Sequence, residues 1–168
     1  MLIQLTKRAD GGAVLRCRRA DGSVTWQIQQ GARAAFFPSH DLTHFAVESE
    51  LAGAVAFYGL IAAGWDIEDT TGKGARGPLP PEAVMVEHIV GLLDIERGSG
   101  HWMSGAEFRA ALRDAGKPAP LLDDDTLTRI RARRSELLGR WRELPAGATL
   151  ELEFIPSYPL SGASHEPS

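Results

Sequence analysis

Two histidines and an aspartate stand together in the stretch HDLTH at residues 40–44. In a helix, residues four apart lie on the same face, so the imidazoles of His40 and His44 can point at one cation. Glu48 continues that face by one more turn and can supply an oxygen ligand or a hydrogen bond to an imidazole. The spacing therefore predicts a divalent metal site, with zinc as the first choice, in which His40, His44 and Glu48 are ligands.

Two histidines alone rarely hold zinc, so a third protein ligand is expected. Glu48 is one candidate. Acidic or imidazole groups farther along the chain are the others: Asp66, Glu68, Asp69, Glu87 and His88. The sequence leaves this choice open.

Asp41 holds the place of the catalytic glutamate in the H-E-x-x-H element, where two histidines bind zinc and the carboxylate acts on the bound water. Over these five residues the chain resembles the zinc proteases, with Asp in place of Glu. Asp41 is therefore expected to be the catalytic residue of a metal-dependent hydrolase, either as the base or as a group that orients a ligand. Because aspartate is shorter by one methylene, its carboxylate would sit differently over a metal-bound water.

The same H-D-x-x-H element is similar to the zinc motif of the coenzyme Q biosynthesis proteins that act on the quinone headgroup. In that family a glutamate follows after eleven intervening residues, where this chain has Ala56. No histidine precedes His40, which departs from the pattern of the HD-type phosphohydrolases. The chain is therefore assigned to neither family.

The alternative function is a non-enzymatic binding or assembly module, in which the histidines only pack, cap or hydrogen-bond near Ser39. Its contact surface would be the exposed sheet face or the arginine-rich segment 129–142. Acidic residues lie around and within that segment, namely the run 123–125 before it, Glu136 inside it and Glu143 directly after it. This mixture favours a salt-bridged, solvent-facing helix over a nucleic-acid surface.

Composition narrows the class of protein. Of the 168 residues, 43% are hydrophobic and 24% are charged, as is typical of globular domains. The net charge of −4 disfavours a general nucleic-acid binder. The single cysteine, Cys17, excludes an internal disulfide and suits a cytoplasmic location. The apolar stretch 51–65 is too short for a membrane span, so no membrane partner is expected. The partners that we expect are a small-molecule substrate and a second copy of the chain.

Three segments of alternating hydrophobicity predict an N-terminal β-meander, at residues 2–7, 13–18 and 23–29. Asp-Gly pairs at 10–11 and 21–22 separate them, and this dipeptide is a strong hairpin signal because its turn needs positive φ. The third segment alternates Val24, Trp26 and Ile28 with polar residues, which predicts a sheet with one buried face.

The alternation returns at 149–154, so a fourth strand is expected to join the meander. The predicted fold class is α+β, a four-stranded, mainly antiparallel sheet with about four helices packed on one face. We expect a single domain over residues 1–155 and a flexible C-terminal tail over residues 156–168.

Four helices are predicted between the strands. The first runs from about His40 to Ala63, with Ser39 as its N-cap and Asp41 near the positive end of its dipole. The others are a helix from about Pro81 to Arg97, one that opens with a capping box at Ser104 and closes at Gly116, and one that follows 123–125 and ends at 144–147. The glycine-rich stretch 67–80 predicts a long loop, whose acidic start can face a cation and whose Lys73 and Arg76 can meet an anion.

Overall fold

The structure is a computed structural model that describes residues 1–51, 55–116 and 122–156. Within these residues it contains a four-stranded antiparallel sheet and five α-helices, which confirms the predicted α+β class. The strands are β1 (Leu2–Lys7), β2 (Ala13–Arg18), β3 (Val24–Gln29) and β4 (Thr149–Glu153). The helices are α1 (Phe37–Glu50), α2 (Phe57–Ala62), α3 (Pro81–Ser99), α4 (Gly105–Asp114) and α5 (Asp124–Glu143). The tail predicted at 156–168 lies, beyond Pro156, outside the described residues.

The strands lie in the order β3-β2-β1-β4, and each neighbouring pair is antiparallel. Gly11 and Gly22 have φ values of 84° and 86°, as the two predicted Asp-Gly turns require. β4 returns from the far end of the chain to pair with β1, so that Ile3 lies opposite Leu152. The predicted meander and its returning fourth strand are both confirmed.

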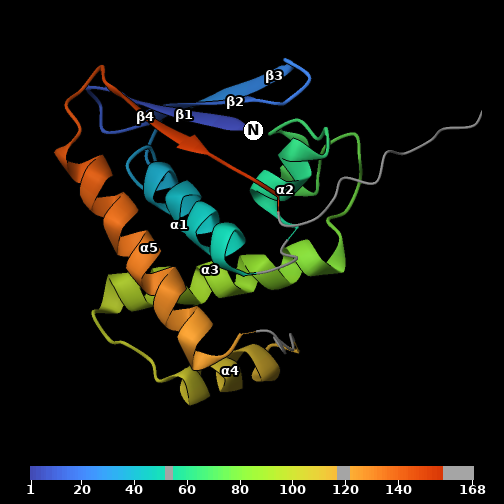
Figure 1. The fold of residues 1–168 in the computed structure, drawn as a ribbon, viewed down its shortest axis with the longest axis vertical. Coiled ribbons are helices and arrows are strands. Elements are labelled where there is room, and N and C mark those ends of the chain that lie inside the picture. Colours follow the sequence, from blue (N-terminus) through green and yellow to red (C-terminus); the bar gives the residue numbers. More distant parts are fainter. Residues whose placement is uncertain (52–54, 117–121, 157–168) are drawn as a thin grey trace, which may run out of the picture.

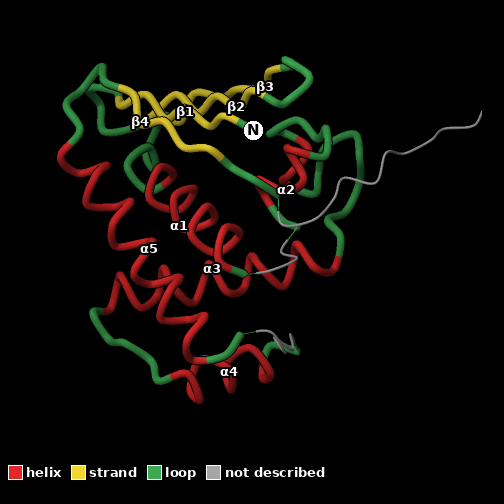
Figure 2. Tube along the Cα trace, in the orientation of Figure 1, coloured by secondary structure: helices red, strands yellow, loops and turns green. Residues whose placement is uncertain are grey.

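The helices cover one face of the sheet, and α1 lies at the centre of the molecule (Figure 1). The tube in Figure 2 shows α1 and α5 beneath the strands, α3 beneath α1, and α4 farthest from the sheet. One core cluster joins the sheet to α1, α2 and α5, and a second joins α1 and α2 to α3, α4 and α5. Because α1 takes part in both cores, polar residues on it are buried as well, among them Asp41, His44 and Glu48.

The prediction of one helix from about His40 to Ala63 is wrong, because the chain forms α1 and α2 instead. α1 begins at Phe37 with Pro38 in its first turn, where the fixed φ of proline suits a helix. Ser39 is therefore inside the helix and is not its N-cap; its hydroxyl donates to the Phe36 carbonyl oxygen at 2.8 Å. Asp41 stands in the second turn, beyond the positions next to the positive end of the dipole.

The apolar side chains of β3 face solvent, which reverses the predicted burial of this strand. Their exposed fractions are 38%, 59% and 44% for Val24, Trp26 and Ile28. The buried face of β3 is polar because its side chains satisfy groups beneath the sheet. Thr25 accepts a hydrogen bond from the Ile67 amide, and Gln29 donates one to Asp41. These partners come from loops and helices that the strand pattern alone does not reveal.

Two of the later helices begin with a side-chain cap. Ser104 and Glu107 form the predicted capping box of α4. The Asp123 carboxylate accepts from the Thr126 amide at the start of α5. α3 runs past its predicted end to Ser99, and Gly100 closes it with a φ of 70°. The long loop after α2 holds a short 3-10 helix at Asp69–Thr71.

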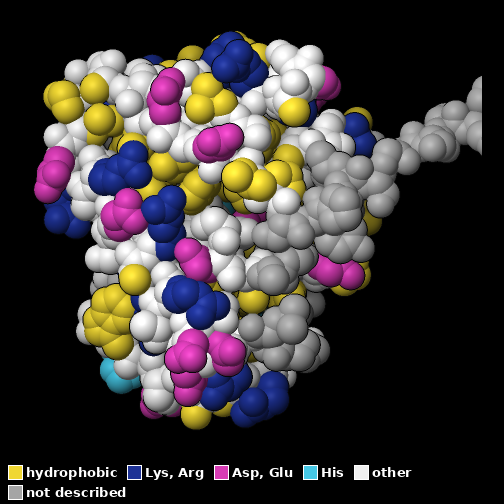
Figure 3. All heavy atoms as spheres, in the orientation of Figure 1, with side chains coloured by type: hydrophobic (Ala, Val, Ile, Leu, Met, Phe, Trp, Pro, Cys, Tyr) yellow, Lys and Arg dark blue, Asp and Glu magenta, His cyan; other side chains and the backbone are white. Residues whose placement is uncertain are grey.

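The arginine-rich helix α5 is salt-bridged, as expected. Acidic and basic side chains lie interspersed over it on the face drawn in Figure 3, and Arg133 donates to Glu136 at 2.8 Å. The expectation that it merely faces solvent is wrong for one side of the helix, because Arg134 is only 3% exposed. No helix in the described part of the chain combines the length and the apolar character that crossing a membrane needs.

Candidate metal centre

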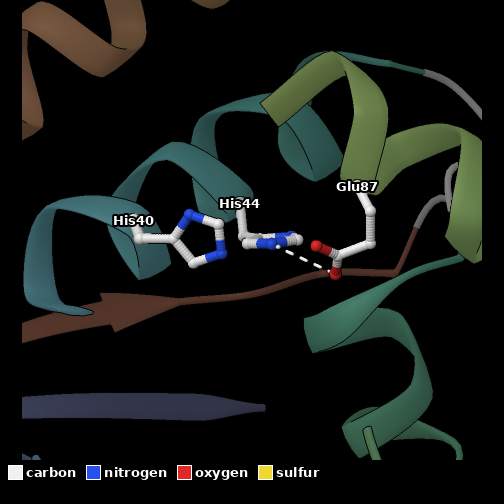
Figure 4. A group of neighbouring side chains, drawn as sticks. All are labelled: His40, His44 and Glu87. Atoms are coloured by element: carbon white, nitrogen blue, oxygen red, sulfur yellow. Dashed lines mark ion pairs between the residues drawn. The ribbon is translucent and has the colours of Figure 1, made fainter. Parts of the chain in front are cut away.

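His40 and His44 project from one side of α1, and Glu87 reaches towards them from α3 (Figure 4). One ligand atom from each of these three side chains lies within 4.8 Å of the other two. His44 Nε2 and Glu87 Oε1 lie 3.3 Å apart. The structure thus brings the two predicted histidines together with Glu87, which is one of the candidates for the third position.

Each imidazole also has a carboxylate at its other nitrogen. His40 Nδ1 lies 2.9 Å from Asp94 Oδ2, and His44 Nδ1 lies 3.5 Å from Glu48 Oε1. In metal sites a carboxylate in this place accepts the ring N–H and so leaves the second nitrogen for the cation. The arrangement therefore leaves Nε2 of both rings to face a common ligand.

Aromatic rings hold the two imidazoles in place. Phe36 stacks on His40 with ring centroids 5.1 Å apart, and Phe57 of α2 lies 5.5 Å from His44. The His44 side chain is 2% exposed, whereas those of His40 and Glu87 are 26% and 36% exposed. The cluster is therefore anchored in the interior and open to solvent at two of its three members.

Glu48, predicted as a ligand, lies beside His44 but outside the three-residue group. Its carboxylate is fully buried and accepts hydrogen bonds from the backbone amides of Ala56, Tyr58 and Gly59 at 3.2, 3.0 and 2.8 Å. These amides belong to the start of α2, whose first N–H groups have no partner within the helix. Glu48 therefore fastens α2 to α1.

Asp41, predicted as the catalytic residue, points its carboxylate towards the sheet. Its Oδ2 accepts a hydrogen bond from Gln29 of β3. Burial raises the pKa of Asp41 to about 6, although the Gln29 hydrogen bond opposes that rise. Within the described residues, Asp41 makes no hydrogen bond to His40 or His44, because one position along a helix turns a side chain by about 100°.

The cluster favours positive charge at its centre. Burial alone would lower the pKa of His44, but the carboxylates of Glu48 and Glu87 raise it to about 10. The contact with His44 also lowers the pKa of Glu87, against the opposing effect of burial. Either a protonated imidazole or a divalent cation can supply the charge that these carboxylates stabilise.

The distances suit a small cation after modest movement. A tetrahedral ion with bonds of about 2.1 Å needs ligand atoms about 3.4 Å apart. The His44–Glu87 separation of 3.3 Å already meets this requirement. The other separations between ligand atoms of the cluster reach up to 4.8 Å. They shorten to the required value if the partly exposed side chains of His40 and Glu87 shift towards the buried His44.

Glu87 also borders an apolar groove between α3 and α4. The groove has a volume of about 390 Å³, and its other lining residues are His88, Gly91, Leu92, Ile95, Ala111, Leu112 and Ala115. A Cβ added at Gly91 would meet no atom within 4 Å, so the glycine leaves space there. The groove is therefore mainly apolar, with the Glu87 carboxylate of the histidine cluster at its edge.

Asp94 is the member of the site that sequence reasoning missed. It lies seven residues after Glu87, so two turns of α3 place both carboxylates on the side that faces α1. The seven-residue spacing of Glu87 and Asp94 in a mainly apolar stretch was the signal in the sequence that could have identified Asp94.

The cluster draws on two helices that are far apart in the chain, so a short motif captures only half of it. Comparison with known proteins names no family, since no family model, no curated protein and no solved structure matches this chain.

Proposed function

We propose that the protein binds one divalent metal ion through His40, His44 and Glu87, and that it is a metal-dependent hydrolase. One observation carries the proposal, namely three ligand atoms within 4.8 Å of one another with a carboxylate behind each imidazole. Zinc is the first choice, because two imidazoles and one carboxylate form a ligand set that catalytic zinc sites use.

The three protein ligands leave a fourth coordination position. The exposure of His40 and Glu87 gives that position access to solvent and substrate. A bound divalent ion would supply a nucleophile near neutral pH by lowering the pKa of water. Asp94 and Glu48 would orient the imidazoles, and of the two roles open to Asp41 we assign it the positioning role, in which it ties α1 to β3 through Gln29.

The apolar groove beside Glu87 supports a small-molecule substrate with an apolar part. That part would lie along Gly91 and Ile95, and its hydrolysable group would reach the metal past Glu87. A cytoplasmic location stays part of the proposal, supported by the single buried thiol of Cys17.

Metal analysis tests the proposal. We expect the purified protein to carry close to one equivalent of zinc or another divalent ion, and the double variant His40→Ala, His44→Ala to carry none. His101→Ala is the matched control, because His101 is exposed and lies on the loop after α3. Wild-type protein that binds no divalent ion at neutral pH, yet is folded, would refute the metal site.

The assembly module remains a second candidate function, favoured by the apolar outer face of the edge strand β3. Two copies that paired their β3 strands would place Val24, Trp26 and Ile28 of both chains side by side on one continued sheet. Light scattering after size-exclusion chromatography tests this candidate. We expect a dimer that Trp26→Ser dissociates and that Trp102→Ser, equally exposed but off the sheet, leaves intact; a monomeric wild-type protein removes the candidate.

A further inference from the structure

A second pocket lies on the other side of Asp94 from His40, between the end of α3 and α5. It has a volume of about 200 Å³, and four arginines, Arg97, Arg131, Arg134 and Arg142, are among its lining residues. Trp102 also lines it and is 59% exposed. No part of the proposed metal chemistry uses these arginines.

The carboxylates near this pocket do not balance its arginines. Glu96 is buried and pairs with Arg131, which also donates to the Met103 carbonyl at 2.7 Å. Asp94 lies 3.6 Å from Arg97 and 3.5 Å from Arg134. Asp94 also pairs with His40. The two carboxylates, Glu96 and Asp94, therefore face four guanidinium groups, which leaves an excess of two positive charges at the pocket.

Arg134 gives the pocket a buried donor. Its side chain is 4% exposed, and its Nε donates to Thr43 at 3.2 Å. Its Nη2 makes no hydrogen bond within the described residues, and the nearest carboxylate oxygen to it, Asp94 Oδ1, lies 3.5 Å away in an ion pair. Arg134 is also crowded by like charge, because Arg97 and Arg131 add to the effect of burial in lowering its pKa while Asp94 opposes them.

Trp102 offers an aromatic surface beside these charges. The Arg131 guanidinium lies 5.5 Å from the centroid of its ring, and Glu96 and the Met103 backbone hold that guanidinium in place. More than half of the Trp102 side chain is still open to solvent. A planar group can therefore stack on the ring while an attached anion meets the arginines.

We propose that this pocket binds a dianionic phosphate group, carried by a small phosphomonoester whose planar part stacks on Trp102. The excess of two positive charges matches a dianion. Arg134 lines the pocket although its side chain is buried, and the exposed Arg142 lines it from the last turn of α5. Guanidinium groups suit phosphate because their planar N–H donors match two of its oxygens.

Calorimetric titration of metal-free protein tests the proposal, with inorganic phosphate and phenyl phosphate as probes and chloride at equal ionic strength as the reference. Removal of metal keeps phosphate from binding at the histidine cluster. We expect saturable binding of one equivalent, with phenyl phosphate tighter than phosphate. Arg142→Ala should weaken both probes about tenfold, the loss that one charge-assisted hydrogen bond represents.

Arg140→Ala is the matched control, because Arg140 lies on the same turn of α5 but pairs with Glu136 at 3.6 Å and does not line the pocket. It should leave both affinities within about twofold of the wild type. Trp102→Ala should reduce the affinity for phenyl phosphate to that for phosphate. Binding no stronger than in chloride, or an equal loss in the Arg142→Ala and Arg140→Ala variants, would overturn the phosphate site. Equal affinities of wild-type protein for the two probes would overturn the role of Trp102.

Discussion

His44 Nε2 lies 3.3 Å from Glu87 Oε1, and this contact joins the central helix α1 to α3 at the candidate metal centre. His44 is buried and its Nδ1 lies 3.5 Å from Glu48 Oε1, whereas the Glu87 side chain is partly exposed and can adjust its position. Glu87 is therefore the member of the cluster whose removal changes cation binding with the least effect on packing.

Glu87→Gln is expected to weaken zinc binding at least tenfold, because a neutral amide is a poor ligand and no longer balances the charge of the ion. Competition with a chromophoric zinc chelator measures the change. Glu82→Gln, an exposed position in the first turn of the same helix, serves as the control and should bind zinc like the wild type. Equal zinc affinities for the wild type and Glu87→Gln would remove Glu87 from the ligand set.

Glu48→Gln is expected to lower the free energy of unfolding by about 3 kcal/mol, because a buried carboxylate that accepts three backbone N–H bonds is replaced by an amide with one acceptor. Urea denaturation followed by circular dichroism gives this value. Glu50→Gln removes a carboxylate from the same helix, but one that only pairs at 3.4 Å with the exposed Arg129, and should cost less than about 1 kcal/mol. Similar losses in both variants would contradict the anchoring role of Glu48.

Gly91→Leu is expected to fill the groove beside Glu87 without harming the fold, since a Cβ there meets open space and leucine favours a helix by roughly 0.8 kcal/mol over glycine. Zinc-loaded wild-type protein should bind octanoate more tightly than acetate, because each methylene buried strengthens binding up to about fourfold. The variant should lose this preference and keep its affinity for acetate. Gly98→Leu is the control that should keep the preference, because Gly98 is also on α3 and also has open space around it. If Gly91→Leu still prefers octanoate, the alkyl chain of octanoate binds somewhere other than this groove.

The stability of the protein is expected to fall as the pH rises above about 9, in part because of Cys17. Burial raises the pKa of the Cys17 thiol from 9.0 to about 12. Between these values the unfolded chain releases a proton that the folded chain keeps, so each pH unit there costs up to about 1.4 kcal/mol. Urea denaturation at pH 8, 9 and 10 should show a shallower fall for Cys17→Ala than for the wild type. Parallel curves would mean that Cys17 titrates normally in the folded protein.

Short-range signals in the sequence determined much of this protein. The two Asp-Gly hairpins and the capping box at Ser104 each depend on residues a few positions apart, and both appear as predicted. The common face of His40 and His44 follows from helical periodicity in the same way.

The tertiary structure decided what depends on distant partners. Glu87 and Asp94 complete the histidine cluster only because α3 packs against α1, and no spacing within the 40–44 motif encodes that contact. The buried polar face of β3 exists because Asp41 and the Ile67 amide need hydrogen-bond partners beneath the sheet, a demand that outweighs the preference of Trp26 for the interior.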